Sequence, residues 1–332
     1  MILRYPHYFE SFRCIAAACP DSCCQEWDVL VDEASAEKYR ALEGPLGEAI
    51  REKLCVDENG QAYFAITDRR CPMWRADGLC RIQAALSHDA LCQTCRDFPR
   101  ITHDFGDFQE KGLALSCPEA ARLIFESPSD WKEIRVDGGE KGDYDTQDME
   151  LLLREREVML TILRDSSLSV PSALTLALLY GYHAQAIFDG EEESAFDPAE
   201  SLAFAAEFRK EADIGILVEF YRTLEILTED WPHRLADPKP VDGWSEALRT
   251  LAIYGMQRYF LQAISDFDIV GRVKMVIAGC LLVRHLGGNL PETAQKYAKE
   301  IENSAENVES ILDGAYTSPA LTDEKLLYWL SC

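Results

Sequence analysis

The chain has 332 residues, of which 47% are hydrophobic, so it can bury a substantial core as one large domain or two unequal ones. Its formal net charge is −25, and a surface of that sign repels nucleic-acid phosphates and attracts cationic partners. The longest apolar run, at 275–283, is about half of a bilayer span, and the start of the chain lacks the pattern of a signal peptide. We therefore expect a cytoplasmic protein that binds neither nucleic acid nor membrane.

In chain order, the first region predicted is irregular and covers residues 1–127. Within it, amphipathic spacing predicts helices over about 33–53 and 117–127, the second opened by Pro118 with Glu119 in its first turn. The best strand signal lies at 62–67.

From about residue 147 the pattern becomes helical. Helices are predicted from Met149 onward, over 172–188, over 200–228 as one or two elements, from Leu248 to Tyr259, from Val273 to a stop at Gly287-Gly288, and after a cap at Asn289. Linkers are expected at 189–199 and 229–243. We predict a mainly α fold with no parallel sheet, in which the irregular cysteine-rich metal-binding region (1–127) packs on an acidic α-helical domain (147–332).

The cysteines are the most informative feature. Ten of the twelve lie between Cys14 and Cys117, and four fall within eleven residues, at Cys14, Cys19, Cys23 and Cys24. A disulfide framework would staple the whole chain, whereas a compact metal site gathers its ligands in one region. Thiolates select zinc, copper(I) or iron–sulfur centres, so the placement predicts a metal site in the N-terminal region.

The type of metal centre is less constrained by the residues alone. Only Cys92 and Cys95 form a CxxC pair, and the six histidines show no pair at ligand spacing, which is unlike the paired knuckles of zinc modules. Irregular ligation by cysteine alone suits either a cubane iron–sulfur cluster or a zinc centre. We favour the iron–sulfur cluster and keep zinc as the alternative.

The cysteines lie in longer motifs, which read Phe12-x-Cys14-Ile15-x3-Cys19-Pro20-Asp21-Ser22-Cys23-Cys24-x2-Trp27, Cys71, Leu79-Cys80-x-Ile82, Thr94-Cys95-x2-Phe98-Pro99-Arg100 and Ser116-Cys117-Pro118-Glu119-x2-Arg122. Over about residues 12–122 these motifs resemble the flagellin lysine-N-methylase family, FliB, within a broader group of cysteine-cluster proteins described as zinc or iron chelators. The family pattern commonly has a glycine after Cys-Ile and another before the tryptophan. This chain has Ala16 and Glu26 there.

The resemblance implies a protein-lysine N-methyltransferase that uses S-adenosylmethionine, carries an iron–sulfur cluster of the 4Fe–4S type, and acts on a protein with exposed lysines such as flagellin. The expected metal ligands are Cys14, Cys19, Cys23, Cys24, Cys71, Cys80, Cys95 and Cys117. Cys55, Cys280 and Cys332 are isolated in the sequence and outside the family pattern, so we expect them to be dispensable. Cys92 is left open.

The sequence offers several side chains for binding substrate or methyl donor, but assigns no catalytic residue. No glycine-rich turn follows a strand, and the CxxxCxxC spacing of radical enzymes is broken at Glu26. Methyl transfer to an amine needs a neutral nucleophile aligned with the sulfonium. Candidates are Trp27 for stacking, Arg100 for a carboxylate, and Glu26 or Glu119 for a cation. Structural alternatives are core packing for Trp27, an ion pair for Arg100 and a helix first-turn acid for Glu119.

Two other functions fit the same residues. One is a zinc-stabilised interaction module, in which the cysteines fold the N-terminal region and the acidic helices bind a basic partner. The other is an iron–sulfur electron carrier or redox sensor. A brown protein would exclude the zinc module, and binding of S-adenosylmethionine would separate the methylase from the carrier.

Overall fold

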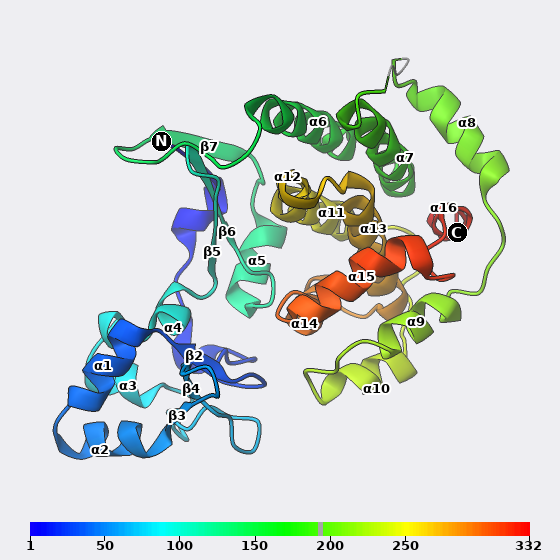
Figure 1. Ribbon diagram of the computed structural model, residues 1–332. Coiled ribbons are helices and arrows are strands. Elements are labelled where there is room, and N and C mark those ends of the chain that lie inside the picture. Colours follow the sequence, from blue (N-terminus) through cyan, green and yellow to red (C-terminus); the bar gives the residue numbers. More distant parts are fainter. Residues whose placement is uncertain (192–194) are drawn as a thin grey trace.

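The computed structural model describes residues 1–191 and 195–332, and the chain is mainly α-helical, as predicted (Figure 1). The helices after residue 145 form one body, and the described strands all lie before residue 136. The helical body consists of α6 (Thr146–Arg164), α7 (Val170–Phe188), α8 (Pro198–Phe208), α9 (Gly215–Arg222), α10 (Asp230–Ala236), α11 (Glu246–Tyr259), α12 (Ala263–Asp266), α13 (Ile269–Leu286), α14 (Leu290–Ile301), α15 (Ala305–Thr317) and α16 (Asp323–Leu330).

Helix α13 runs through the centre of this body and packs against α7, α11, α14 and α15. It ends where the sequence predicts, at Gly287, whose φ is +68° and where a Cβ would lie 1.7 Å from the carbonyl oxygen of Lys239. Asn289 caps the next helix by accepting a hydrogen bond from the backbone N–H of Glu292 at 3.2 Å. Both predicted boundaries are confirmed. None of the helices described is both long enough and apolar enough to cross a bilayer.

Two helical predictions need correction. The single helix expected over 33–53 is two, α1 (Glu33–Ala41) and α2 (Gly44–Lys53), because Leu42 and Glu43 are extended and Gly44 adopts a positive φ of 81°. The linker expected at 229–243 contains α10, which buries Trp231 to 1% exposure against the large core. The linker expected at 189–199 includes residues 192–194, which lie outside the described residues.

A four-stranded sheet joins segments that are far apart in the sequence. Its order is β5 (Arg100–Asp104), β6 (Phe108–Leu113), β1 (Ile2–Pro6), β7 (Trp131–Arg135). Strand β1 pairs in parallel with β6, with Ile2 opposite Phe108, and the other two pairs of the sheet are antiparallel. The sheet is therefore mixed, and the prediction of no parallel sheet has to be corrected for this one parallel pair. The paired strands are separated by about a hundred residues of chain, and local alternation carries no information about the direction of such a partner.

The sheet is fixed to the helical body by a buried ion pair. Arg156 of α6 is 1% exposed and donates two hydrogen bonds of 2.6 Å to the carboxylate of Glu110 on β6. A bidentate pair of this kind fixes orientation as well as distance. It holds the sheet, and with it the start of the chain, against α6.

Two hydrophobic cores result. The small core holds the sheet β2 (Val29–Val31), β4 (Ala62–Phe64), β3 (Leu54–Val56), flanked by α1, α2, α3 (Arg81–Ala85) and α4 (Gln93–Asp97). Strand β4 lies within the predicted strand signal. The large core takes in the helical body together with Tyr8, Phe12 and α5 (Pro118–Glu126), which packs against α11 and α14. The segments that precede and follow the small-core region in the sequence therefore pack against the helical body.

Candidate functional site

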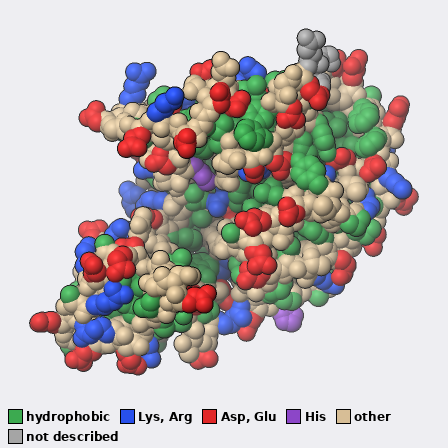
Figure 2. All heavy atoms as spheres, in the orientation of Figure 1, with side chains coloured by type: hydrophobic (Ala, Val, Ile, Leu, Met, Phe, Trp, Pro, Cys, Tyr) green, Lys and Arg blue, Asp and Glu red, His purple; other side chains and the backbone are tan. Residues whose placement is uncertain are grey.

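A cavity of about 460 Å³ lies where the small-core region meets the helical body, and Figure 2 shows the molecule hollowed between these two parts. The cavity wall gathers seven of the twelve cysteines, all of them free thiols: Cys14, Cys19, Cys23, Cys24, Cys80, Cys95 and Cys117. Of the predicted ligands, only Cys71 lies off this wall, buried in the small core beside Cys92. Cys55, Cys280 and Cys332 do not line the cavity.

Local structure explains why thiols from distant segments meet here. Cys14 and Cys19 flank the short 3-10 turn Ala16–Ala18. Cys80 immediately precedes α3 and Cys117 immediately precedes α5, so each thiol is placed by the first turn of a helix that is packed on a core. The irregular segments that sequence analysis identified thus converge because their flanking elements are anchored.

The thiols form two neighbouring sets. The inner set packs on the small core and consists of Cys24, Cys71, Cys80, Cys92 and Cys95. The outer set lies toward the helical body and consists of Cys14, Cys19, Cys23 and Cys117, the last packed on the large core. The consecutive residues Cys23 and Cys24 join the sets, since a hydrogen bond connects their two thiols.

The environment of each set controls its protonation. Burial raises the pKa of Cys71 to about 12 and that of Cys117 to about 11, so both are neutral thiols at pH 7. The hydrogen bond from Cys23 lowers the pKa of Cys24 to about 7, and a hydrogen bond from Cys95 likewise lowers the pKa of Cys92. Cys24 and Cys92 are therefore the thiols best placed to supply thiolate.

The thiols on the cavity wall match a metal centre in donor type. All-thiol donors gathered on one wall match the chemistry of an iron–sulfur or zinc centre. Within residues 1–191 and 195–332, however, no three Cys, His, Asp or Glu side chains converge closely enough to hold a metal ion. The residues fit such a centre in donor type and location, but the described side chains are not spaced as direct ligation of one ion requires.

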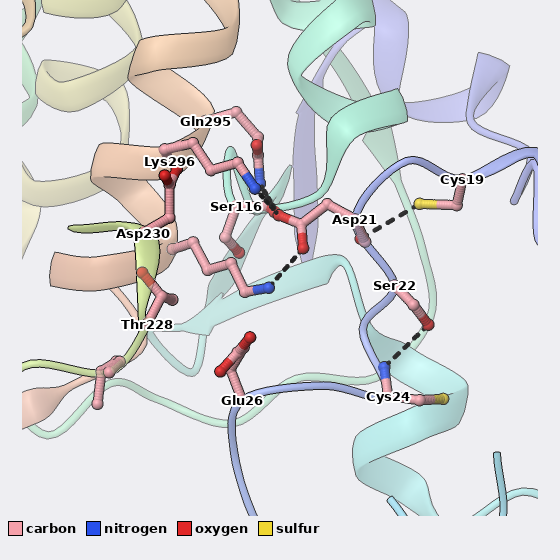
Figure 3. Close-up of polar contacts among 12 residues, drawn as sticks. Cys19, Asp21, Ser22, Cys24, Glu26, Ser116, Thr228, Asp230, Gln295 and Lys296 are labelled. Carbon is pink, nitrogen blue, oxygen red and sulfur yellow. Dashed lines mark hydrogen bonds and ion pairs between the residues drawn. The ribbon is translucent and has the colours of Figure 1, made fainter. Parts of the chain in front are cut away.

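Asp21, in the loop between Cys19 and Cys23, ties the outer set to α14 (Figure 3). Lys299 Nζ lies 2.6 Å from Asp21 Oδ1, and Lys296 Nζ and Gln295 Nε2 each lie 2.9 Å from Oδ2. Burial would raise the pKa of Asp21, but the lysines and Gln295 outweigh it and hold the pKa below its ordinary value. Gln295 also donates to the carbonyl oxygen of Ser116 at 2.7 Å, next to Cys117. One helix therefore supports both the first cysteine loop and the Cys117 segment.

The structure brings three of the four predicted binding residues to the cavity: Trp27, Arg100 and Glu119. Trp27 presents its ring to Lys299 Nζ at 5.5 Å from the centroid, and Glu119 forms an ion pair with Arg122 at 2.7 Å in the first turn of α5. Glu26 does not line the cavity. It forms an ion pair of 2.5 Å with Arg69.

Sequence reasoning missed three cations that line the cavity, Arg13, Arg96 and Lys299. Arg13 and Arg96 adjoin Cys14 and Cys95, so proximity to the cysteine motifs could have identified them. Lys299 lies on α14, far along the chain, and no sequence signal links it to the cysteines.

Ala16 and Glu26, which stand where the family pattern commonly has glycine, both adopt a positive φ, of 52° and 80°. Glycine takes this conformation freely because it lacks a Cβ, whereas an L-residue is strained there. The turn geometry therefore gives a physical reason for glycine in the pattern. At Glu26 the ion pair with Arg69 offsets part of this strain, whereas the methyl side chain of Ala16 forms no polar contact that could offset it.

The motifs and the thiol-lined cavity define this chain as a cysteine-motif protein. Its candidate site lies between the small-core region and the helical body. Over 129 residues it is 30% identical to the flagellar biosynthetic protein FliU of Salmonella muenchen, a match covering 37% of this chain and 76% of FliU. Over the same length it is 30% identical to the lysine-N-methylases of Salmonella typhimurium and Salmonella choleraesuis. The chain belongs to the family of FliU and the flagellin lysine-N-methylases.

The match covers only 32% of each lysine-N-methylase. No family model matches the chain, and no solved structure does.

Replacing Ala16 by glycine should stabilise the protein. We expect Ala16→Gly to raise the free energy of unfolding by about 1 kcal/mol, because the left-handed strain is removed. The control Ala17→Gly, in the same turn but without a positive φ, should lower it by about 0.5–1 kcal/mol. Denaturant unfolding of the metal-free protein measures both. Equal destabilisation by the two substitutions would show that the turn at residue 16 carries no strain.

Removing the charge of Asp21 should weaken the junction with α14. Lys299 is 3% exposed and would keep an uncompensated charge, so we expect Asp21→Asn to lower the free energy of unfolding by about 3 kcal/mol. The control Asp28→Asn alters an exposed carboxylate that accepts one hydrogen bond, from Ile66 N–H, and should cost less than about 1 kcal/mol. Denaturant unfolding compares them, and similar losses would contradict the role given to Asp21.

Proposed function

We propose that the protein is an S-adenosylmethionine-dependent protein-lysine N-methyltransferase and that its cysteine-lined cavity holds an iron–sulfur cluster. The observation that carries the proposal is the gathering of seven thiols on one cavity wall, in a chain whose relatives include proteins named lysine-N-methylase. The cavity, at about 460 Å³, is within the size range of small-molecule sites.

The metal ligands we propose are drawn from the eight cysteines of the motifs, of which one cubane cluster takes four. Cys92, the fifth thiol of the inner set, is left unassigned. When bound, the cluster supplies a fixed metal centre at the cavity wall. The protein's own contribution is a partly apolar wall that includes Phe12, Ile15 and Phe98. Burial beside such groups lowers the pKa of a lysine and so favours the neutral amine that methyl transfer requires.

Trp27 is proposed to contact the methyl donor. Its ring already faces the Lys299 ammonium, which shows that the environment of this indole accommodates a cation on its face. The sulfonium of S-adenosylmethionine is a cation of the same kind. Arg100, on the same wall, is proposed to bind the donor's carboxylate.

The substrate we propose is a protein with exposed lysines, with flagellin as the first candidate. The acidic helical body supplies long-range attraction for such a surface, since most of the net charge of −25 lies after residue 125. No nucleic acid or membrane partner is proposed.

A zinc-stabilised interaction module is the second candidate, and the burial of Cys71 and Cys92 in the small core favours it. Structural zinc sites are closed and surrounded by protein. An iron–sulfur electron carrier would use the same thiols. Metal and sulfide analysis distinguishes the zinc module, and donor binding distinguishes the carrier.

Anaerobically purified protein should contain iron and acid-labile sulfide. We expect Cys14→Ser, at an exposed thiol of the outer set, to lower the iron content, because one ligand of the centre is lost. Cys55→Ser and Cys332→Ser, at thiols off the cavity wall, serve as matched controls and should retain the full content. Stoichiometric zinc without sulfide would sink the iron–sulfur proposal and leave the zinc module.

The reconstituted protein should transfer labelled methyl groups to lysine side chains of flagellin or another lysine-rich surface protein. We expect the rate to fall as ionic strength rises from about 0.05 to about 0.5 M, because the Debye length shrinks from about 14 to about 4 Å and screens the acidic body. Scintillation counting of the isolated substrate measures the transfer. Absence of labelled lysine, together with no binding of S-adenosylmethionine, would end the methyltransferase proposal.

A further inference from the structure

The cavity wall carries uncompensated positive charge in a chain whose net charge is −25. Three arginines line it, Arg13, Arg96 and Arg100. The other charges on the wall are already paired within the protein: Lys299 with Asp21 at 2.6 Å, and Glu119 with Arg122 at 2.7 Å. His88 also lines the cavity. The excess on the wall is therefore cationic.

Arg100 contacts the ring of Phe12, and Arg13 contacts the backbone of the same residue. The guanidinium carbon of Arg100 lies 5.0 Å from the Phe12 ring centroid. Arg13 Nη1 donates to the backbone carbonyl oxygens of Phe12 and Glu10, at 2.7 and 2.9 Å. Neither guanidinium forms an ion pair with any residue that the structure describes. Arg96 differs from them, because its Nε forms a long ion pair of 3.9 Å with Asp97.

Two guanidinium groups that line one cavity and form no ion pair make the electrostatic potential in the cavity positive, and a positive potential attracts an anion. A guanidinium presents a planar fork of N–H donors that matches a carboxylate, and such charge-assisted hydrogen bonds are the strong ones. Among the residues that the structure describes, Arg13 donates only through Nη1, and no acceptor bonds the Arg100 guanidinium. The arrangement is therefore suited to a carboxylate that enters the cavity.

We propose that Arg13 and Arg100, with Arg96 on the same cavity wall, form the subsite for the carboxylate of the methyl donor. The proposal rests on the proposed function. The proposed function assigned the donor's carboxylate to Arg100 alone, and this proposal adds Arg13 and Arg96 to the same subsite. It also assigns the direction of the donor, whose amino-acid end lies toward Phe12 and whose sulfonium lies toward Trp27, another residue of the same wall.

The same positive charge could instead offset negative charge on a thiolate-ligated metal centre. Replacing the arginines distinguishes the two anions, the donor's carboxylate and the metal centre with its thiolates. If they bind the donor's carboxylate, the metal centre is unaffected. If they serve the metal centre, iron content or its visible absorption changes, and donor binding falls whether or not the ligand has a carboxylate.

The test is calorimetric titration of the anaerobically reconstituted protein, as wild type and as the double variant Arg13→Gln with Arg100→Gln. Both arginines are exposed, so folding should be preserved. We expect affinity for S-adenosylmethionine to fall at least about tenfold, while affinity for its decarboxylated form and the iron content stay unchanged. Arg135→Gln, an exposed arginine of β7 away from the cavity, is the control and should leave both affinities unchanged.

An equal loss of affinity for both forms of the donor, or a loss of iron in the double variant, would overturn the subsite. Unchanged affinity for S-adenosylmethionine would overturn it as well. Titration with methionine, which has the same carboxylate but no sulfonium, distinguishes failure of the subsite from failure of the proposed function. A wild type that binds methionine in an arginine-dependent manner, but not S-adenosylmethionine, keeps the carboxylate subsite and ends the methyl-transfer proposal. Binding of neither ligand rejects both.

Discussion

The carboxylate of Asp21 is the contact on which the geometry of the site depends. It lies in the loop between two cysteines and accepts hydrogen bonds from Lys296, Lys299 and Gln295 of α14. Lys299 is almost fully buried, and a buried ammonium without a counter-charge would be costly. The contact therefore has two effects. The Asp21 carboxylate neutralises the buried charge of Lys299, and α14 fixes the position of the loop that carries Asp21. Without this contact, the loop that carries Cys19 and Cys23 would lose its direct connection to α14.

The support extends from α14 to the far side of the cavity. Gln295 holds the Ser116 carbonyl, and Glu302, just after the helix, accepts a hydrogen bond from the Tyr254 hydroxyl at 2.8 Å. That hydroxyl in turn accepts from the backbone N–H of Leu115 at 3.1 Å. The segment leading into Cys117 is thus held at two successive residues by the helical body. The small core supports the inner thiols in a different way, by hydrophobic packing around Cys71 and Cys92.

Much of this could be predicted from local sequence, because local rules govern it. The end of α13 at Gly287 and the cap at Asn289 depend on residues within one helical turn, and the cysteine motifs identify the thiol-bearing segments. Features that depend on distant partners could not be predicted. The parallel pairing of β1 with β6 joins strands a hundred residues apart, and Lys299 reaches the cavity only through the packing of α14. The break between α1 and α2 was missed because the apolar spacing continues across it.

The loop that carries Cys19 and Cys23 also carries the carboxylate that docks on α14. Any ligand that orders this loop therefore also strengthens its docking, and docking in turn strengthens binding of that ligand, because thermodynamic coupling between two sites is reciprocal. A change in ligand affinity at the cavity consequently also changes how strongly the loop docks on α14. A substitution on α14, distant in sequence from every thiol of the cavity wall, acts as a change in affinity at the cavity, and an occupied cavity makes the whole chain harder to unfold.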